Sequence, residues 1–319
     1  MNNFRNIDEI QDVLPIYFRA WWLDMVYGKG MWQYITETDA DGFIVGILPY
    51  SIKRKLFFKL ITMSPETSYG GPFIIKSKER KTNSQISFEN NILESIIKKV
   101  PKVDFVYFQC KPDLLSYLPF LWQKYIINIS YTYRIDLRLD IQLIHSQMKG
   151  STRTDIKRCQ NEDLITQQSK DVPSFIEFLK SSFTEKSKGI PYKLEQIAKI
   201  ITETINQECG FILYCKNREY EIVAGIFVMF DKDTAYYYAG TNYVSKFGSA
   251  ALSFCIWESI KLVKSKGIKY FDFEGSDIRG IEHYFRNFGG DLLPIYRVHK
   301  SKNTMIRLLA YFQNKKLFG

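Results

Sequence analysis

The order in which strands and helices are predicted constrains the fold most, because one order occurs twice in 319 residues. In each half, a group of strands is followed by a helix, a strand, a second helix and a last strand. Residues 1–138 carry the first series and residues 139–299 carry the second. The duplication is architectural, since no residue-level repeat accompanies it. This order predicts an α/β (α+β) fold with two domains, each a mixed, mostly antiparallel sheet flanked by helices.

The individual elements follow from hydrophobic periodicity and from turn residues. A helical stretch is predicted at Ile7–Val26, and Asp39–Gly42 is typical of a hairpin turn. After four helices, the second half is predicted to contain three strands, a helix, a strand, a helix and a strand: Phe211–Lys216, Ile222–Phe230, Thr234–Gly240, Ser249–Lys266, Tyr270–Glu274, Ile278–Phe288 and Leu292–His299. Within residues 300–319, Thr304–Phe318 forms a basic amphipathic pattern. We expect that helix to pack back on the first domain, and the alternative is that it lies on an anionic membrane.

Composition excludes several classes of protein. Hydrophobic residues make up 45% of the chain and charged residues 24%, as in ordinary globular proteins. The net charge of +10 indicates either an anionic partner or a lysine-rich solvated surface. The 5 cysteines form no C-x-x-C pair and the 3 histidines have no metal-binding spacing, so we expect reduced thiols and no metal. A cytoplasmic location is expected, because no signal segment and no bilayer-spanning stretch is present.

A loop rich in small residues joins a predicted strand to the long helix, and it is the first candidate binding site. Backbone N–H groups at the positive end of a helix dipole suit a pyrophosphate. We therefore predict that a ligand carrying a pyrophosphate binds at Ser245, Lys246, Phe247, Gly248, Ser249, Ala250 and Ala251. The alternative is a helix that starts at a glycine and binds no ligand.

The strand predicted at Tyr270–Glu274 places two carboxylates on one face, because side chains alternate along a strand. Such a pair is unusual on a buried element, so Asp272 or Glu274 is a candidate general base. The alternative for Asp272 is that its carboxylate caps the following turn. Tyr243, Tyr284 and Arg286 are candidates to donate a proton or a hydrogen bond to a substrate.

Two stretches resemble motifs of a known family. Residues 245–250, Ser-Lys-Phe-Gly-Ser-Ala, resemble the R/Q-x-x-G-x-G/A phosphate-binding turn of GNAT enzymes. Residues 272–275 and 284–290 resemble the DF-x-G … Y/F-K-x-x-FG signature of Fem-type acyltransferases, which are related to the GNAT enzymes. Looser similarity lies at Trp21-Trp22, Pro65, Tyr69–Pro72 and Arg153–Cys159.

The resemblance implies two tandem GNAT-like domains and a transferase. An acyl or aminoacyl group would pass to an amine acceptor, either a cell-wall (peptidoglycan) precursor or an amino sugar. The implied donor is acyl-CoA or aminoacyl-tRNA, with no tightly bound cofactor. The expected partners are the acceptor, tRNA and, by peripheral contact, the inner face of the membrane, but not DNA. Substrate contacts are predicted at Trp22, Tyr69, Arg153, Lys157 and Tyr238.

One position departs from the family pattern. Phe285 stands where Fem-type enzymes carry a lysine that is thought to stabilise charge at the ester carbonyl, and Arg286 follows it. On a helix, a shift of one residue turns the side chain by about 100°. The departure weakens the case for aminoacyl-tRNA as donor more than the case for acyl transfer. A non-catalytic RNA-binding protein is the alternative from another class, supported by positive charge and aromatic content.

Overall fold

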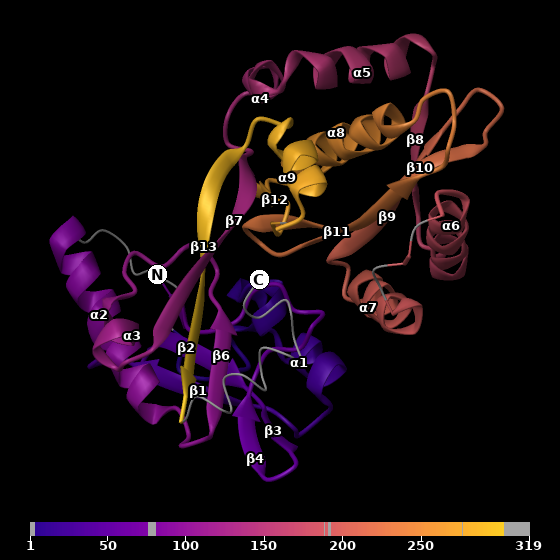
Figure 1. Ribbon diagram of the computed structural model, residues 1–319. Helices are drawn as coiled ribbons and strands as arrows, with labels where there is room; N and C mark the ends of the chain where they lie inside the picture. Colours follow the sequence, from indigo (N-terminus) through magenta and orange to yellow (C-terminus); the bar gives the residue numbers. More distant parts are fainter. Residues whose placement is uncertain (1–3, 76–80, 188, 191–192, 276, 303–319) are drawn as a thin grey trace. The chain divides into compact units, whose positions relative to one another are not determined.

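The computed structural model describes residues 4–75, 81–187, 189–190, 193–275 and 277–302. The chain divides into two compact units, and Figure 1 colours it along the sequence. Met1–Tyr131 and Leu293–Gly319 form the first unit, and Thr132–Leu292 forms the second. The predicted domain boundary after residue 138 falls inside the second unit. The predicted helix Thr304–Phe318 lies outside the described residues.

The first unit begins with short helices and a small sheet. The single helix predicted at Ile7–Val26 is wrong, because Pro15 separates η1 (Gln11–Val13) from η2 (Ile16–Phe18) and α1 (Ala20–Tyr27). A three-stranded antiparallel sheet has the order β1 (Gln33–Thr38), β2 (Ile44–Tyr50), β5 (Phe73–Ile74). The predicted hairpin turn joins β1 to β2, and Asp39 Oδ1 accepts the N–H of Phe43 there.

A second set of strands and a long helix complete this unit. The strands are neighbours in the order β3 (Ile52–Lys55), β4 (Phe58–Ile61), β6 (Phe105–Gln109), β13 (Asp291–Ser301). Helix α2 (Thr82–Lys99) approaches β2 at Gly46, where an added Cβ would lie 2.5 Å from Ile92 Cγ2. The short helix α3 (Leu118–Trp122) follows β6. Apolar residues of α2, including Ile92 and Ile96, form one core with β2 and β6.

The second unit contains a mixed sheet of six strands. Their order is β7 (Ile126–Asp136), β12 (Tyr270–Asp272), β11 (Thr234–Asn242), β10 (Ile222–Phe230), β9 (Gly210–Lys216), β8 (Ile165–Ser169). The β11–β12 pairing is parallel, and the other pairings in this set are antiparallel. β7 begins in the first unit and ends in the second, and β13 returns in the opposite direction.

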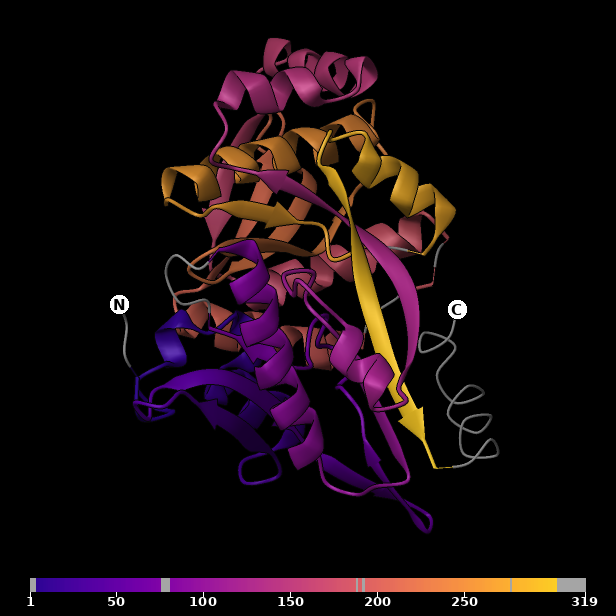
Figure 2. The same ribbon diagram turned by 90° about the vertical axis from the view of Figure 1, so that its left-hand side faces the viewer.

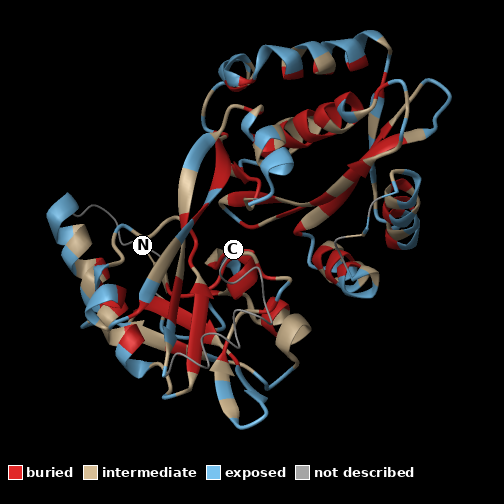
Figure 3. Ribbon diagram, viewed as in Figure 1, coloured by how far each residue is buried: buried red, intermediate tan, exposed pale blue. Residues whose placement is uncertain are grey.

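Helices cover both faces of this sheet. One face carries α8 (Ser249–Ser265) and α9 (Arg279–Arg286), and the other carries α6 (Val172–Glu185) and α7 (Leu194–Asn206). The helix α4 (Ile141–Gln147) leads into α5 (Gly150–Asn161), which lies along the outer side of α8 in both Figure 1 and Figure 2. Because α8 is enclosed by α5 and the sheet, it is buried along most of its length, as Figure 3 shows.

The predicted α/β class is confirmed, and most predicted elements of the second half are present. The edge strand β8 was not predicted, because its sequence Ile-Thr-Gln-Gln-Ser lacks apolar alternation. The strand predicted at Tyr270–Glu274 is shorter than expected and ends at Asp272. Among the described residues, no helix is long and apolar enough to cross a bilayer.

Candidate active site

The parallel pairing of β11 with β12 ends early and leaves the edge of β11 open. The pairs are Thr234–Tyr270, Ala235–Phe271 and Tyr236–Asp272. β11 continues to Asn242. The segment that follows β12 turns away from β11, with φ angles of 59° at Glu274 and 76° at Gly275. Within the described part of the chain, residues 237–242 thus have no strand neighbour on that side. β11 and the chain after β12 therefore diverge beyond the pair Tyr236–Asp272.

The turn after β11 begins α8, as predicted, but only part of it faces solvent. Gly248 has φ 53° and ψ −132°, a conformation that glycine adopts without strain. Ser249 is exposed, whereas Ala250 and Ala251 are buried. The N–H groups of Gly248 and Ala250 already donate to carbonyls within the turn. The prediction that all seven residues hold the donor is therefore too broad, and the exposed Ser249 is the best placed.

Helix α5 fastens this turn to the rest of the unit. Arg158 Nη2 donates to the carbonyl of Phe247 at 3.2 Å, and Lys246 forms an ion pair with Glu162. Phe247 itself is buried, with 5% of its surface exposed, so it anchors the turn rather than offering a ligand contact. The role of Arg158 was not predicted, since its partner lies 89 residues away in the sequence.

A row of basic residues follows one face of α5, as the four-residue spacing predicts. Lys149 and Lys157 are exposed, whereas Arg153 is half-buried and donates from Nη1 to the carbonyl of Ser146 at 3.1 Å. That bond satisfies a carbonyl in the last turn of α4. The predicted substrate contacts at Arg153 and Lys157 remain predictions.

Tyr284 joins α9 to the beginning of α8. Its hydroxyl lies 2.9 Å from Ser253 Oγ, and Ser253 in turn donates to the carbonyl of Ser249 at 3.1 Å. Either hydroxyl can donate in the contact between Tyr284 and Ser253. Burial raises the pKa of Tyr284 above its ordinary value, and the bond to Ser253 opposes this. The phenol therefore stays protonated at neutral pH and can donate a hydrogen bond.

Asp272 is not placed to act as a base, which corrects the prediction. Its side chain is fully buried, and Oδ2 lies 3.2 Å from Nε and 3.1 Å from Nη2 of Arg134. Oδ1 accepts from Thr132 Oγ1 and from the N–H of Glu274, each at 2.7 Å. The last bond confirms the alternative, because this carboxylate caps the turn after β12. A buried carboxylate with these partners cannot reach an incoming amine.

Glu274 follows the end of the strand, so the prediction of two carboxylates on one strand face is wrong. Its φ of 59° is uncommon for a residue with a side chain, and such strain is frequent at functional sites. Its N–H is held by Asp272, and its side chain is half-buried. Of the two predicted bases, Glu274 is therefore the one that the fold leaves accessible.

Phe285 and Arg286 take different positions on α9. Phe285 is buried and stacks on Phe273, with ring centroids 4.7 Å apart. Arg286 is exposed, and its Nε lies 3.5 Å from Glu282 Oε1, which also accepts from Tyr133. Phe285, which stands where Fem-type enzymes carry a lysine, is thus a core residue. Arg286 points to the carboxylate of Glu282.

A lysine that was not predicted reaches the end of the open strand. Lys186 directly follows α6, and its Nζ lies 3.0 Å from Thr241 Oγ1 and 3.2 Å from Asn242 Oδ1. Thr241 and Asn242 belong to the part of β11 that extends beyond its pairing with β12. No motif surrounds Lys186, and 55 residues separate it from Thr241, so only the fold identifies it.

Two further predicted site residues, Tyr243 and Tyr238, contact α6 or the strands beside it. Tyr243 packs edge-on against Phe178 of α6 at 5.0 Å, and its N–H donates to the carbonyl of Val223. Tyr238 is the extra residue at a bulge in β11, and its ring contacts Phe227 at 6.2 Å. Both are half-buried, and their roles toward substrate remain predictions.

Trp22 and Tyr69 belong to the core of the first unit, which corrects their predicted role in binding substrate. Both are fully buried, and Trp22 Nε1 donates to Thr67 Oγ1 at 3.0 Å. Tyr69 lines a cavity of about 10 Å³. Such a volume holds about one water molecule and no larger ligand. Their aromatic contacts, such as the 4.8 Å approach of Tyr17 to Trp22, stabilise the fold.

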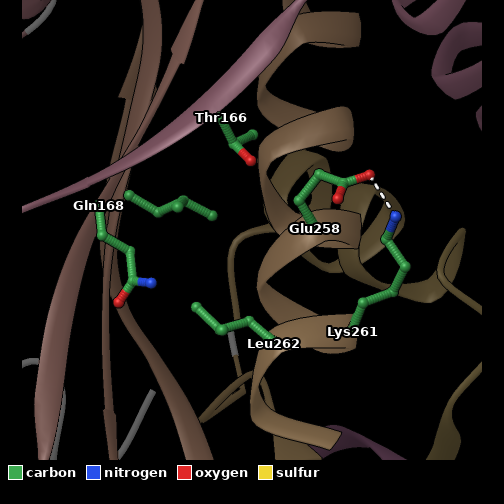
Figure 4. A pocket seen from close by; sticks show the side chains of 6 residues that line it. Thr166, Gln168, Glu258, Lys261 and Leu262 are labelled. Carbon is green, nitrogen blue, oxygen red and sulfur yellow. Dashed lines mark ion pairs between the residues drawn. The ribbon is translucent and has the colours of Figure 1, made fainter. Parts of the chain in front are cut away.

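A larger depression of about 340 Å³ lies elsewhere in the second unit (Figure 4). Glu258 and Lys261 of α8 form an ion pair of 2.7 Å at its rim. Glu258 lies nine residues beyond the start of α8, which is about 14 Å along a helix. This depression is therefore separate from the turn and from Tyr284. It is lined by Thr166, Gln168, Leu213, Glu258, Lys261 and Leu262.

A known protein family matches part of the second unit. Residues 147–286 match the family described as acetyltransferase (GNAT) domain, and the segment includes the turn, Glu274 and Tyr284. No curated protein matches the sequence significantly.

Solved structures share the fold over nearly the whole chain. FemX has a TM-score of 0.75 at 12% identity, covering 97% of this chain and 99% of FemX. The C-terminal DUF2156 domain of a putative lysylphosphatidylglycerol synthetase from Agrobacterium fabrum has a TM-score of 0.55 at 12% identity, covering 92% and 91%. L-PGS from Bacillus licheniformis has a TM-score of 0.52 at 13% identity, covering 91% and 90%.

These findings decide between the two classes of function. A GNAT domain match that spans α5 to α9 leaves the non-catalytic RNA-binding alternative without support. The full-length likeness to FemX confirms the predicted fold of two tandem units. Residues 147–286 thus carry a GNAT acyltransferase domain, in a chain whose two-unit fold is like that of FemX.

Proposed function

We propose that the second unit transfers an aminoacyl or acyl group from an activated donor to the amine of a cell-wall precursor or an amino sugar. The observation that carries this proposal is the 2.9 Å contact between the hydroxyl groups of Tyr284 and Ser253. The contact joins a phenol that can give up a proton to helix α8, whose start would bind the acyl donor. The donor would be aminoacyl-tRNA or acyl-CoA. The reaction would take place in the cytoplasm, where both donors are made.

Each step of the transfer has a candidate group in the second unit. The amine nitrogen attacks the donor carbonyl, and Glu274 accepts the amine proton, directly or through a water molecule. Ser249 holds the phosphate of the donor by its backbone N–H at the start of α8. Tyr284 gives its proton to the departing oxygen or sulfur. No covalent enzyme intermediate is needed.

Lys186 supplies the positive charge that is missing at Phe285, which lies in the core where Fem-type enzymes carry a lysine. Charge develops on the carbonyl oxygen during acyl transfer, and a fixed cation nearby stabilises it. The Nζ of Lys186 lies at the edge of β11 that faces no strand in the described residues, held by Thr241 and Asn242. In this proposal Lys186 takes over the role that the resemblance assigns to the lysine of Fem-type enzymes.

The aminoacyl donor is favoured by the fold. FemX and the synthetase domain from Agrobacterium fabrum share it at TM-scores of 0.75 and 0.55, and lysylphosphatidylglycerol synthetase is named for an aminoacyl product. The exposed Lys149 and Lys157 on α5, beside the turn that Arg158 holds, suit the phosphates of an RNA end. Acyl-CoA is the second candidate, favoured by the glycine turn at Gly248.

A mass measurement tests the proposal. The purified protein is incubated with pooled cell-wall precursors and amino sugars, together with either charged tRNA or acetyl-CoA. The proposal predicts that one acceptor gains the mass of the acyl group with one of the two donors. The absence of any mass gain with both donors, for a protein shown to be folded by circular dichroism, would contradict it.

A further inference from the structure

The hairpin that joins β3 to β4 exposes two large apolar side chains at its tip. Leu56 and Phe57 form the two-residue turn, with 83% and 95% of their surfaces exposed. In Figure 3 the hairpin, located by the labels β3 and β4 in Figure 1, is largely coloured as exposed. Burial of side chains of this size is worth about 2 kcal/mol each, so the hairpin gives up stability that an inward orientation would provide.

The backbone at this tip also departs from what a hairpin favours. Leu56 has a φ of 54°, in the left-handed region. Two-residue hairpin turns normally place Gly, Asn or Asp at such a position. The left-handed backbone conformation is strained for other residues, because their Cβ atom approaches the following carbonyl oxygen. A leucine that is both strained and exposed indicates that its side chain serves a contact outside the chain.

Positive charge surrounds the tip. No acidic residue occurs between Gly42 and Pro65, while the hairpin carries Lys53, Arg54, Lys55 and Lys59. Arg54 lies directly opposite Lys59 in the strand register. Like charges in that position are destabilising, and a nearby anionic surface would reverse the effect.

Two acidic residues, Asp104 and Glu66, interact with residues of the hairpin. Asp104 Oδ2 accepts the backbone N–H of Lys59 at 2.9 Å, and its other oxygen lies 3.9 Å from Lys302. Glu66 acts on Lys53, whose pKa is lowered by burial and raised by that carboxylate. Lys53 also lies over the ring of Tyr27 at 5.3 Å. Arg54, Lys55 and Lys59 are thus the cations nearest the exposed tip.

We propose that the β3–β4 hairpin docks the protein on an anionic lipid bilayer, with Leu56 and Phe57 inserted below the headgroups. Residues in a strand advance about 3.3 Å, so Arg54, Lys55 and Lys59 lie one or two residues behind the tip at about 3–7 Å. Interfacial apolar groups reach about 5–10 Å into the headgroup and acyl boundary. The cations therefore meet lipid phosphates when the tip enters the hydrocarbon.

Other occupants fit this hairpin less well. A nucleic acid would use Phe57 for stacking but would gain little from an aliphatic leucine at the outermost position. A second copy of the chain would bring two cationic hairpins together, which repel. The pairing of aliphatic and aromatic tip residues with flanking cations is the arrangement that an anionic membrane favours.

Vesicle co-sedimentation tests the inference without any assay of transfer. The full chain is mixed with vesicles of phosphatidylcholine alone or with about one third phosphatidylglycerol. We expect binding to the anionic vesicles only, weakened as salt is raised. The variant L56N/F57S is expected to lower the partition coefficient about tenfold, because the inserted apolar area is lost. Its melting temperature is expected to equal or exceed that of the wild type, since Asn tolerates the left-handed backbone.

The β9–β10 hairpin offers a matched control. Tyr220 is also exposed, at 71%, with a φ of 61°, but acidic Glu219 and Glu221 flank it. The variant Y220S is expected to bind vesicles as the wild type does. Absence of wild-type binding to anionic vesicles, or unchanged binding by L56N/F57S, would overturn the inference. Loss of tRNA binding by L56N/F57S, with vesicle binding retained, would assign the hairpin to RNA instead.

Discussion

At the scale of single residues, burial distinguishes charged side chains that stabilise the fold from those that can contact a substrate. Asp272 and Arg134 are 0% and 5% exposed and hold β12 to β7. Glu274, two residues further on, is half-buried and has strained backbone. The bond from the N–H of Glu274 to Asp272 connects the two roles. Asp272 therefore positions the candidate base rather than acting as one.

We expect Asp272→Asn to act through stability. The substitution leaves the buried guanidinium of Arg134 without its charge partner, which costs about 3 kcal/mol or more. Chemical denaturation with urea measures the loss. The double variant Asp272→Asn with Arg134→Met should lose less than the sum of the two single variants, because neither charge is then stranded. An unchanged unfolding free energy together with a lost transfer rate would restore Asp272 as a catalytic base.

Lys186→Met is expected to lower kcat about tenfold or more while the affinity for the donor changes little, because the charge would act on the transition state. Lys186→Arg should recover part of the rate. Steady-state kinetics separates kcat from KM. Lys180→Met is the matched control, since Lys180 lies on the same helix with a 58% exposed side chain and pairs only with Glu177 among the described contacts. Equal effects of both substitutions would refute the role of Lys186.

At the scale of elements, the sequence predicts local structure well and long-range contacts poorly. The helix Ser249–Ser265 and the turn before it follow from periodicity and a glycine, and the structure contains both. Strand β8 escapes prediction because an edge strand needs no apolar face. Lys186 and Arg158 could not be found either, since they meet their partners across 55 and 89 residues. The error at Asp272 has the same origin, because Arg134 is distant in sequence.

The two ends of α8 allow a test of the donor turn. Gly248→Ala is expected to weaken donor binding, because φ 53° with ψ −132° is strained for alanine and the turn must shift. An added Cβ at Gly248 meets no atom within 4 Å, so crowding is not the cause. Gly267→Ala, with φ 80° and the same open surroundings beyond the other end of α8, should cost similar stability but leave binding unchanged. Calorimetric titration with the donor compares the two variants, and equal affinities would contradict the assignment of the turn.

At the scale of the whole molecule, the chain buries many tyrosines, which predicts sensitivity to alkali. Burial raises the pKa of Tyr27, Tyr34 and Tyr125 to about 12, against an ordinary value of 10.0. Between these two values the unfolded chain loses protons that the folded chain keeps, so stability falls as pH rises. Below pH 10 this contribution is fully present. Thermal melts should show a steady melting temperature up to about pH 9 and a fall between about pH 10 and 12. A melting temperature that is constant across this range would contradict the burial of these phenols.

The fold class could be predicted from the sequence because the order of elements is repeated, and the likeness to FemX extends over 97% of the chain. The first unit was harder to interpret at the residue level. Trp22 and Tyr69 resemble family residues, yet both lie in its core, since aromatic content serves packing before it serves recognition. Leu56 and Phe57 show the opposite, because these apolar residues are exposed at a hairpin tip and do not pack in a core.

The role of Tyr284 as the proton donor is the central claim, and the transfer rate of Tyr284→Phe tests it most directly. Single-turnover transfer should slow about 100-fold, with donor affinity and melting temperature near wild type, because Ser253 keeps its bond to Ser249. Tyr133→Phe, which removes the other phenol bonded to α9, should leave the rate nearly unchanged. A Tyr284→Phe protein that transfers the acyl group at the wild-type rate would contradict the account.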